Sequence, residues 1–293
     1  MDQRRDRDPG ETEEHQSVEE TEAHKIIIIF AFAVFCKLVV VSERLGEPMS
    51  TAIHRIAMWS GPRNISTALM RSWGNRPDAF VCDEPLYAHY LLKTGVQHPG
   101  AEEVIRSQEN DWRKVVARLT EYEPPGKSIF YQKHMTHHLL AEIDHSWLDR
   151  MSNVFLIREP REVIASFVKV AGEPRLEDTG YPQQLEIFNF VRRQTGKVPP
   201  VVDARDVLED PLRLLQLLCS ALDVPFTEAM LSWPSGPRAT DGVWAKYWYG
   251  AVLESTSFQP YRAGNDPVPT HLARLLEEAQ PIYQQLHKYR LGQ

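Results

Sequence analysis

Two short segments combine an arginine with hydroxyl side chains in arrangements suited to binding phosphate groups. The first, GPRNIST at 61–67, follows an apolar run and leads into a helical pattern. Such a loop offers unpaired backbone N–H groups and the positive end of a helix dipole to an anion. The residues expected to contact that anion are Gly61, Arg63, Asn64, Ser66 and Thr67. The alternative is a tight turn followed by a helix capped by an Asn or Ser side chain.

The second segment is REPREVIAS at 158–166, which follows another apolar run. Arg158 leaves the expected strand, and Ser166 comes eight residues later, about two turns into the next helix. An arginine and a serine placed in this way can converge on a second phosphate, the arginine through a charge-assisted contact. The alternative is a surface ion pair between these arginines and the neighbouring Glu159 or Glu162.

The first loop meets the Walker pattern G-x-x-x-x-G-K-[ST] only in part. Gly61 is in place and Ser66 and Thr67 stand near its end, but the second glycine and the lysine are missing. An ATP or GTP hydrolase that depends on this lysine is therefore disfavoured.

Apolar and β-branched runs alternate with helical patterns from residue 50 onward. We expect strands at 53–59, 79–82, 128–132, 154–157 and 200–204. We expect helices at 66–73, 101–120, 139–150, 160–167 and after Asp210-Pro211. This alternation predicts an α/β domain with a P-loop NTPase-like parallel sheet flanked by helices on both faces. Both phosphate-binding segments would then lie at the carboxyl edge of the sheet, where such folds bind ligands.

Composition excludes several classes of protein. The 293 residues are 42% hydrophobic and 25% charged, as in globular proteins. Most of the net charge of −7 lies in residues 1–25, which hold nine acidic and four basic residues, so the remainder is nearly neutral and a nucleic-acid partner is not expected. Three widely separated cysteines, Cys36, Cys82 and Cys219, predict neither disulfides nor a zinc site, and a cytoplasmic location is expected.

The N-terminal region divides into two parts before the predicted domain at 50–293. Residues 1–25 are acidic and polar, and we expect them to be disordered. Residues 26–48 form a hydrophobic segment and linker, in which 26–41 are apolar except for Lys37. This run is shorter than the roughly 17–25 residues of a membrane span. Membrane contact is expected only through 26–41, if at all; the alternative is that Met49 is the working start.

Three landmarks together resemble the PAPS-dependent sulfotransferases, which have a P-loop-like α/β domain. WSGPRNISTALMR (59–71) is similar to the family's loop for the 5′-phosphosulfate of the donor, and REPREVIAS to its 3′-phosphate segment. DARDVLEDP (203–211) is similar to an acidic segment that ends in Asp-Pro before a helix. The resemblance implies that PAPS (3′-phosphoadenylyl sulfate) is the co-substrate, without a metal.

The sequence departs from the family at two places. Arg63 stands where the loop usually has a lysine, which keeps the charge but changes its reach. The usual Arg-Lys-Gly loop near the C-terminus has only weak counterparts, Arg238 and Lys246, which leaves the adenine end of the site open.

A narrower resemblance rests on WSGPRNISTALM, DEPLYAHYL, KHMTHHL and IREPREV. These segments are similar to a sulfotransferase-like group of bacteria and fungi. A related domain occurs in plants fused ahead of a branched-chain aminotransferase-like domain. We expect no pyridoxal phosphate domain and no aminotransferase chemistry in this chain.

Sulfuryl transfer needs a base for the acceptor and positive charge for the leaving phosphate. Arg63 and Lys133 are candidates for the charge. Glu84, after the second strand, is favoured as the base, and His134 is the alternative because its region resembles the family's Lys-x-His. Lys133 and His134 are adjacent, so both reach one site only if the third strand ends before them.

The histidines and aromatic residues nearby allow further interpretations. His134 and His138 are four residues apart, but no third metal ligand is evident, so a metal is not expected. His137 and His138 are expected to be solvated or to cap a helix start. The aromatic residues at 244–249 could stack on adenine, line an acceptor pocket or belong to the core.

The resulting hypothesis is an enzyme that moves a sulfuryl group from PAPS to a hydroxyl or amine of a small-molecule acceptor. The alternatives are another P-loop nucleotide-dependent transferase or hydrolase, and a non-catalytic nucleotide-binding module. The sequence indicates neither the acceptor nor the oligomeric state.

Overall fold

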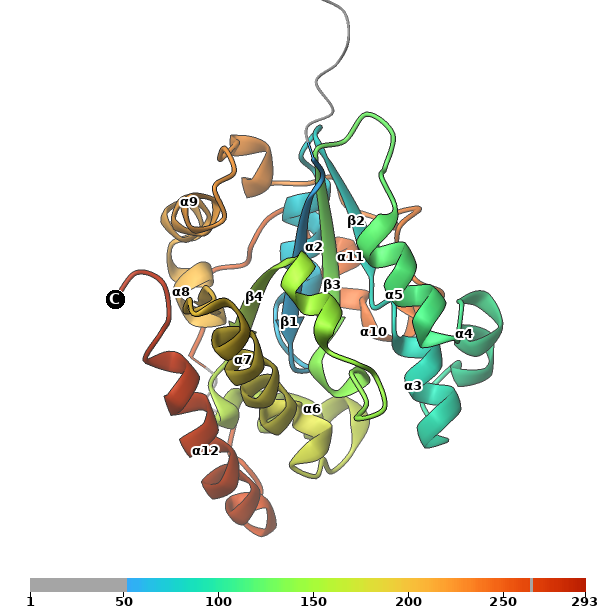
Figure 1. Cartoon of the computed structure of the whole chain (residues 1–293). Coiled ribbons are helices and arrows are strands. Elements are labelled where there is room, and N and C mark those ends of the chain that lie inside the picture. Colours follow the sequence, from blue (N-terminus) through green and yellow to red (C-terminus); the bar gives the residue numbers. More distant parts are fainter. Residues whose placement is uncertain (1–51, 264–265) are drawn as a thin grey trace, which may run out of the picture. The chain divides into compact units, whose positions relative to one another are not determined.

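A parallel β-sheet forms the centre of the computed structural model, which describes residues 52–263 and 266–293 (Figure 1). Within these residues the sheet has five strands in the order β2-β3-β1-β4-β5. The strands are β1 (His54–Ser60), β2 (Ala79–Asp83), β3 (Ile129–Met135), β4 (Ser152–Ile157) and β5 (Val201–Asp203). The neighbours of β1 are β3 and β4, so the loops after β1 and β4 leave adjacent strand ends.

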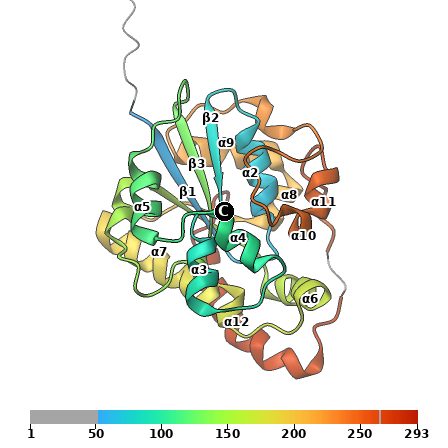
Figure 2. The same ribbon diagram turned by 90° about the vertical axis from the view of Figure 1, so that its right-hand side faces the viewer.

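Helices cover both faces of the sheet. Successive strand residues point to opposite faces, and apolar side chains on each face pack against helices. Ile56 and Met58 of β1 belong to one buried cluster, and Ala57 and Trp59 belong to the other. The first face is covered by α2 (Ser66–Gly74), α8 (Ala204–Glu209), α9 (Pro211–Ala221) and α10 (Ala245–Trp248). The second is covered by α5 (Trp112–Glu121), α7 (Tyr181–Thr195) and α12 (Ala273–His287). Figure 2 shows α5 and α7 across the sheet from α2 and α9.

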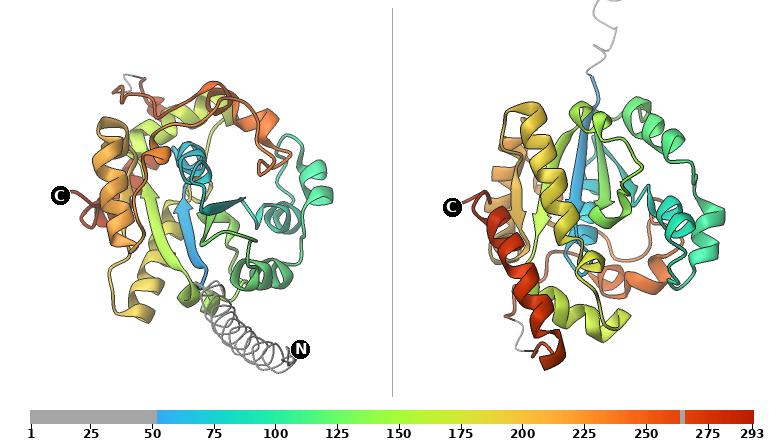
Figure 3. Two further views of the ribbon diagram at one scale, coloured as in Figure 1. Left: turned by 90° about the horizontal axis from the view of Figure 1, so that it is seen from above. Right: turned by 60° about the horizontal axis from the view of Figure 1, so that its bottom comes forward.

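The remaining helices lie around the carboxyl edge and the periphery. They are α3 (Tyr87–Thr94), α4 (Ala101–Ser107), α6 (Pro160–Ala171) and α11 (Gly250–Glu254). Short 3₁₀ turns are η1 (Thr136–His138), η2 (Ser146–Arg150), η3 (Glu177–Thr179), η4 (Glu228–Leu231) and η5 (Thr270–Leu272). Figure 3 shows α12 running beside α7. The prediction of an α/β fold with a helix-flanked parallel sheet is confirmed.

Two helix predictions are wrong. The single helix expected at 101–120 is two helices, because the chain turns extended at Gln108 and Asp111 then caps α5 by accepting from the backbone N–H of Arg113. The helix expected at 139–150 is absent from the described residues apart from the turn η2. There the Asp144 carboxylate accepts hydrogen bonds from the backbone and hydroxyl of Ser146, a local pattern that competes with helix formation.

The third strand is longer than predicted. It continues through Lys133 and His134 to Met135 instead of ending at 132, since it pairs with β1 and β2 on its two sides. Lys133 and His134 therefore point to opposite faces of the sheet.

The expectations for residues 1–25 and 26–48 lie outside the described residues, as does the apolar run at 26–41. Among the residues that are described, no helix combines the length and apolar character needed to cross a bilayer.

Candidate functional site

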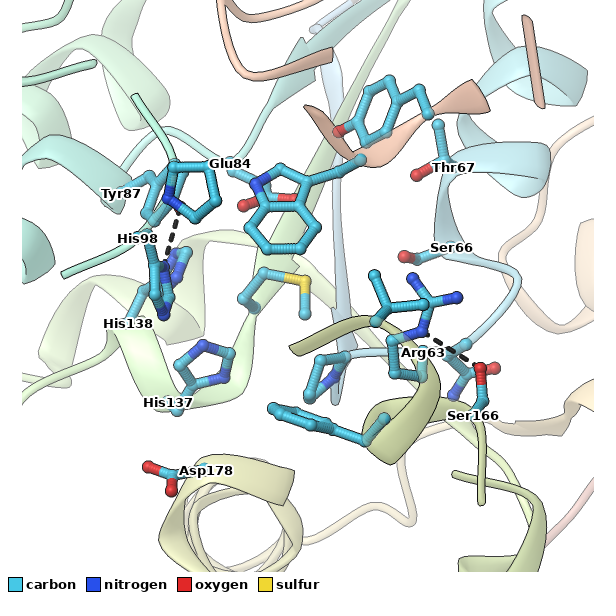
Figure 4. A pocket seen from close by; sticks show the side chains of 18 of the residues that line it. Arg63, Ser66, Thr67, Glu84, Tyr87, His98, His137, His138, Ser166 and Asp178 are labelled. Carbon is cyan, nitrogen blue, oxygen red and sulfur yellow. Dashed lines mark hydrogen bonds between the residues drawn. The ribbon is translucent and has the colours of Figure 1, made fainter. Parts of the chain in front are cut away.

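A cavity of about 680 Å³ opens at the carboxyl edge of the sheet (Figure 4). Its walls come from the segments that follow β1, β2, β3 and β4, and from residues 248–252. Figure 4 shows Arg63, Ser66, Thr67 and Ser166 on one side, and Tyr87, His98, His137 and His138 on the other. We call the first set, together with Arg158, the cationic half. The second set, together with Tyr90 and Trp248, is the ring half. The volume is in the range of pockets for small-molecule ligands.

The loop after β1 is held against the turn at Thr179 and Gly180. A Cβ atom on Gly61 would collide with the carbonyl oxygen of Thr179, so only glycine allows this close approach. Gly180 has a φ of 77°, and a Cβ atom there would lie 3.2 Å from the Cα atom of Gly61. The hydroxyl of Thr136 donates to the carbonyl of Gly180 at 2.9 Å. Two glycines and one threonine thus fix the position of the loop at 61–67, which was predicted to bind phosphate.

We expect Gly180→Ala to lower the free energy of unfolding by about 1–3 kcal/mol. The added Cβ atom meets the left-handed backbone penalty and also lies 2.5 Å from the hydroxyl oxygen of Thr136. Gly196→Ala is the matched control, because its φ is 66° and nothing lies within 4 Å of its Cβ position. Urea unfolding should show the larger loss for Gly180→Ala, and equal losses in the two variants would contradict this account.

The two predicted phosphate segments meet in the cationic half. The Nε atom of Arg63 donates to the hydroxyl of Ser166 at 3.0 Å, and the Nη1 atom of Arg158 donates to the carbonyl of Arg63 at 2.7 Å. Asn64 donates to the carbonyl of Leu156 at 3.1 Å, which ties the loop to β4. These contacts bring residues 92 to 103 positions apart into one site.

The N-terminus of α2 faces the same site. Ile65 occupies the cap position without a side-chain cap, so the predicted alternative of a capped helix is not what forms. Ser66 and Thr67 line the cavity, and within the described residues their hydroxyl groups make no hydrogen bond. Backbone N–H groups and hydroxyls at a helix start suit an anion.

The positive charge of this half is only partly neutralised. Arg158 pairs with Glu162 at 2.9 Å, as the surface-pair alternative anticipated, whereas Arg63 forms no ion pair with any described residue. Burial lowers the pKa of Arg63, and the neighbouring guanidinium of Arg158 lowers it further. Two adjacent cations with one carboxylate leave a net positive site, which an anionic ligand would stabilise.

Glu84, Lys133 and Asp83 form a buried ionic network beside the cationic half. The Lys133 ammonium donates to Asp83 at 2.9 Å, to Glu84 at 2.5 Å and to the hydroxyl of Tyr249 at 2.6 Å. The Tyr249 hydroxyl in turn donates to Asp83 at 2.8 Å. The Lys133 side chain is only 1% exposed, and that of Glu84 is 11% exposed. Lys133 is therefore committed to its two carboxylates, and it fixes Glu84 at the cavity wall.

The same burial perturbs these groups. Desolvation raises the pKa of Glu84, and the opposing charge of Lys133 limits the rise. Burial opposes the charge on Lys133, but Asp83 and Glu84 together raise its pKa well above the usual value. Glu84 also has a φ of 40°, a left-handed backbone conformation that is strained for a residue other than glycine. Backbone strain of this kind occurs mainly at functional sites.

His134 does not reach the cavity. Its ring stacks on Trp59 with centroids 4.4 Å apart and is 1% exposed, and its Nε2 atom lies 3.2 Å from the Gln132 side-chain oxygen. Burial lowers the pKa of His134 to about 3. Because β3 continues past Lys133, this histidine faces the opposite side of the sheet, and we do not retain it as a base.

We expect His134 to make stability depend on pH. The unfolded histidine has a pKa of about 6.5 and the folded one about 3, so the unfolded state binds more protons between these values. Stability should fall as the pH drops below about 6.5, by about 2 kcal/mol between pH 7 and 5 from this group. Urea unfolding at both pH values should show that His134→Gln loses this contribution and that His271→Gln, at an exposed position, keeps it. An unchanged pH dependence in His134→Gln would contradict the expectation.

Arg238 also lies away from the cavity. Its guanidinium donates to the carbonyl of Pro234 at 2.6 Å, and its backbone N–H donates to Asp241, which pairs with Arg71. Lys246 is exposed and pairs with Glu103. Neither residue therefore lines the cavity in this structure.

The ring half was only partly anticipated. His137 and His138, expected to be solvated or capping, line the cavity, and His138 is 3% exposed. Of the aromatic residues at 244–249, Trp248 and Tyr249 line the cavity and Trp244 is buried in the core. Tyr87, Tyr90 and His98 were missed, because a helical pattern and a loop histidine carry no chemical signature. No group of three or more potential metal ligands occurs within 52–263 and 266–293.

Comparison with known proteins gives a consistent result. A family model described as "Sulfotransferase domain" matches residues 54–290. Branched-chain-amino-acid aminotransferase-like protein 1 of Arabidopsis thaliana is 36% identical over 234 residues, which are 80% of this chain and 42% of that protein. Protein 2 of the same name and organism is 34% identical over 228 residues, which are 78% of this chain and 40% of that protein. The chain thus spans less than half the length of the curated relatives it matches.

Solved structures also resemble the chain, at low sequence identity. The sulfotransferase domain of the curacin biosynthetic pathway is 19% identical with a TM-score of 0.46, and the match covers 82% of this chain and 98% of that one. The sulfotransferase domain of the Synechococcus PCC 7002 olefin synthase is 18% identical with a TM-score of 0.49, over 79% and 96% of the two chains.

Proposed function

The chain belongs to the sulfotransferase domain family, and on that premise we propose that it moves a sulfuryl group from PAPS to a hydroxyl or amine of a small acceptor. The observation that carries the proposal is the contact between Arg63 and Ser166 at 3.0 Å, which joins the two segments that were predicted to bind phosphate. A nucleotide with phosphates at both its 5′ and 3′ positions needs two such segments side by side.

The residues of the cationic half fit this nucleotide. The N-terminus of α2, with Ser66 and Thr67, would hold the 5′-phosphosulfate, and Arg158 with Ser166 would hold the 3′-phosphate. Arg63 lies between them and has no carboxylate partner among the described residues. The net positive charge of the site would be neutralised by such a ligand.

Glu84 is proposed as the general base. Its carboxylate lies at the cavity wall and would accept the proton that the acceptor hydroxyl or amine loses. The acceptor oxygen or nitrogen then bonds to sulfur, the bond from sulfur to the bridging phosphate oxygen breaks, and the electron pair stays on that oxygen. Arg63 and the N–H groups of α2 would stabilise the charge left on the phosphate.

The contacts of Lys133 support a different role from the one expected from the sequence. Its ammonium already donates to Asp83, Glu84 and Tyr249, so we propose that it holds Glu84 in place and in its ionised form rather than contacting the leaving group. Lys133 is thus a positioning residue.

Aminotransferase activity is not proposed. The two relatives carry an aminotransferase-like name, but this chain matches only 42% and 40% of their lengths, and its own residues 54–290 match the sulfotransferase domain model.

Two experiments test the proposed function. Thermal unfolding is measured with adenosine 3′,5′-bisphosphate (PAP), ATP or GTP, and PAP alone should stabilise strongly by mass action. Radiolabelled PAPS is then incubated with the chain and a small-molecule extract, and label should enter new products. Stabilisation by ATP or GTP as strong as by PAP would favour another nucleotide-dependent enzyme. Binding of PAP without transfer to any acceptor would favour a non-catalytic module.

A further inference from the structure

The transfer chemistry above gives no role to the ring half of the cavity. It combines rings from four separate segments, namely α3, the loop before α4, the end of β3 with η1, and α10. Its members are Tyr87, Tyr90, His98, His137, His138 and Trp248. Figure 4 shows the labelled ones across the cavity from Arg63 and Ser166. The acceptor must approach from the side opposite the leaving nucleotide, which makes this half its binding region.

His138 is locked in one orientation. Its ring lies parallel to that of Tyr87, with centroids 4.7 Å apart and an angle of 5°, and it stacks on Tyr90 at 4.7 Å and 29°. Tyr87 is itself fixed by a 2.8 Å hydrogen bond between its hydroxyl and the Nδ1 atom of His98. His137 packs edge-on against both Tyr90 and His138. A ring held on several sides presents its nitrogen atoms in fixed directions.

The surroundings of the ring nitrogen atoms of His137 and His138 favour one tautomer. The Nδ1 atoms of both rings are buried without a hydrogen-bond partner among the described residues. A buried N–H donor without an acceptor is costlier than a bare lone pair, so the proton belongs on Nε2. The Nε2 atoms are not among the buried unpartnered atoms, and both residues line the cavity. Each ring therefore presents an N–H donor to the cavity.

The charge around these rings favours an uncharged ligand. Burial lowers the pKa of His137 to about 4 and lowers that of His138 well below its usual value, so both are neutral at physiological pH. The nearest cations are engaged, Lys133 with Asp83 and Glu84, and Arg175 with Asp178. A ligand carboxylate would find no free cation here among the described residues. A ligand ammonium would face two N–H donors, and the Asp178 carboxylate beside them is already paired with Arg175.

We propose that His137 and His138 form a recognition pair for the acceptor, and that the pair selects an uncharged planar hydroxy compound with a second oxygen that accepts hydrogen bonds. The aromatic rings of Tyr90 and Trp248, which line the cavity, suit a flat molecule. The two Nε2–H groups suit a carbonyl or amide oxygen on it. The inference rests on the proposed function, because it concerns the acceptor of the same site.

The first test reads the histidines directly and needs no turnover. Nitrogen-15 spectra of the imidazole groups in the full chain should show His137 and His138 neutral, with the proton on Nε2, from pH 6 to 8. Assignment comes from His137→Phe and His138→Phe, which keep a ring but lose the donors. Protonation on Nδ1, or a charged ring at pH 7, would overturn the proposal.

The second test uses three matched phenols in the presence of PAP. 4-Hydroxybenzamide carries an uncharged oxygen acceptor, 4-cresol carries none, and 4-hydroxybenzoate is charged. By calorimetry, the amide should bind roughly fivefold to tenfold more tightly than 4-cresol and than the carboxylate. His138→Phe should remove the preference for the amide over 4-cresol, and His145→Phe, outside the cavity, should keep it.

The outcomes separate this inference from the proposed function. Equal binding of the amide and 4-cresol overturns the recognition pair even if labelled PAPS is turned over. The nitrogen-15 signals of the two histidines could instead shift on adding PAPS but on adding neither PAP nor a phenol. That result would mean that the pair contacts the sulfuryl group, and it would also overturn the recognition pair. Loss of PAP binding would instead remove the proposed function, while the histidine spectra without nucleotide still report the tautomers.

Discussion

Glu84→Gln is expected to lower the turnover of sulfuryl transfer by about 10²–10⁴-fold while leaving PAP binding unchanged. The glutamine keeps the size of the side chain and can still accept the hydrogen bond from Lys133, but it cannot take the proton of the acceptor. Turnover is measured with labelled PAPS and PAP affinity by calorimetry. Glu121→Gln, at an exposed carboxylate outside the cavity, is the control and should match the wild type.

The pH dependence of the wild type gives a second check on Glu84. Burial raises its pKa, so the acidic limb of the rate profile should lie above the range of an exposed glutamate. The rate should fall as the pH drops through that raised pKa, because the protonated carboxyl is no longer a base. A Glu84→Gln variant with wild-type turnover would rule Glu84 out as the base.

Lys133→Met is expected to lower the free energy of unfolding by about 3–5 kcal/mol. The change removes the cation between Asp83 and Glu84 and leaves two buried carboxyl groups beside each other. Lys114→Met is the control, because Lys114 is 69% exposed and its nearest carboxylate, Glu109, is 3.6 Å away. Urea unfolding of both variants measures the difference, and the control should lose less than about 1 kcal/mol.

The Lys133→Met variant should also regain stability in mild acid relative to the wild type. Without the ammonium, one carboxyl group of the pair takes up a proton because like charges cannot both be ionised there. Its pKa in the folded state then lies above its pKa in the unfolded state, so stability is greatest at low pH and falls as the pH rises through the raised value. A loss of stability in Lys133→Met that is the same at pH 5 and 7 would contradict this assignment of the buried network.

The sheet could be predicted because each strand is an apolar run that ends at a polar or glycine-rich turn. The predicted strands at 53–59 and 154–157 match β1 and β4 to within two residues at each end. Helix limits were less predictable where local hydrogen bonds compete with the helix. Asp111 starts a new helix at a position that the amphipathic pattern runs through, and Asp144 diverts its segment into a turn.

Parts of the site depend on contacts that sequence cannot supply. Residues 61–67 and 158–166 were predicted to cooperate, because they follow strands and carry arginine and hydroxyl groups. The exclusion of His134 depends on where β3 ends, which is decided by pairing with β1 and β2. The hydrogen bonds that hold the Lys133 ammonium include one to Tyr249, which is 116 residues away in the chain.

The central claim is that one nucleotide is bound by the loop of Arg63 and by the Arg158–Ser166 pair together. Calorimetry with PAP and with adenosine 5′-phosphate tests it most directly, since the two ligands differ only in the 3′-phosphate. The wild type should bind PAP about 10-fold to 100-fold more tightly, Arg158→Ala should lose that preference, and Arg161→Ala, at an exposed position on α6, should keep it. Equal affinities for the two nucleotides, or a preference that survives in Arg158→Ala, would contradict the claim.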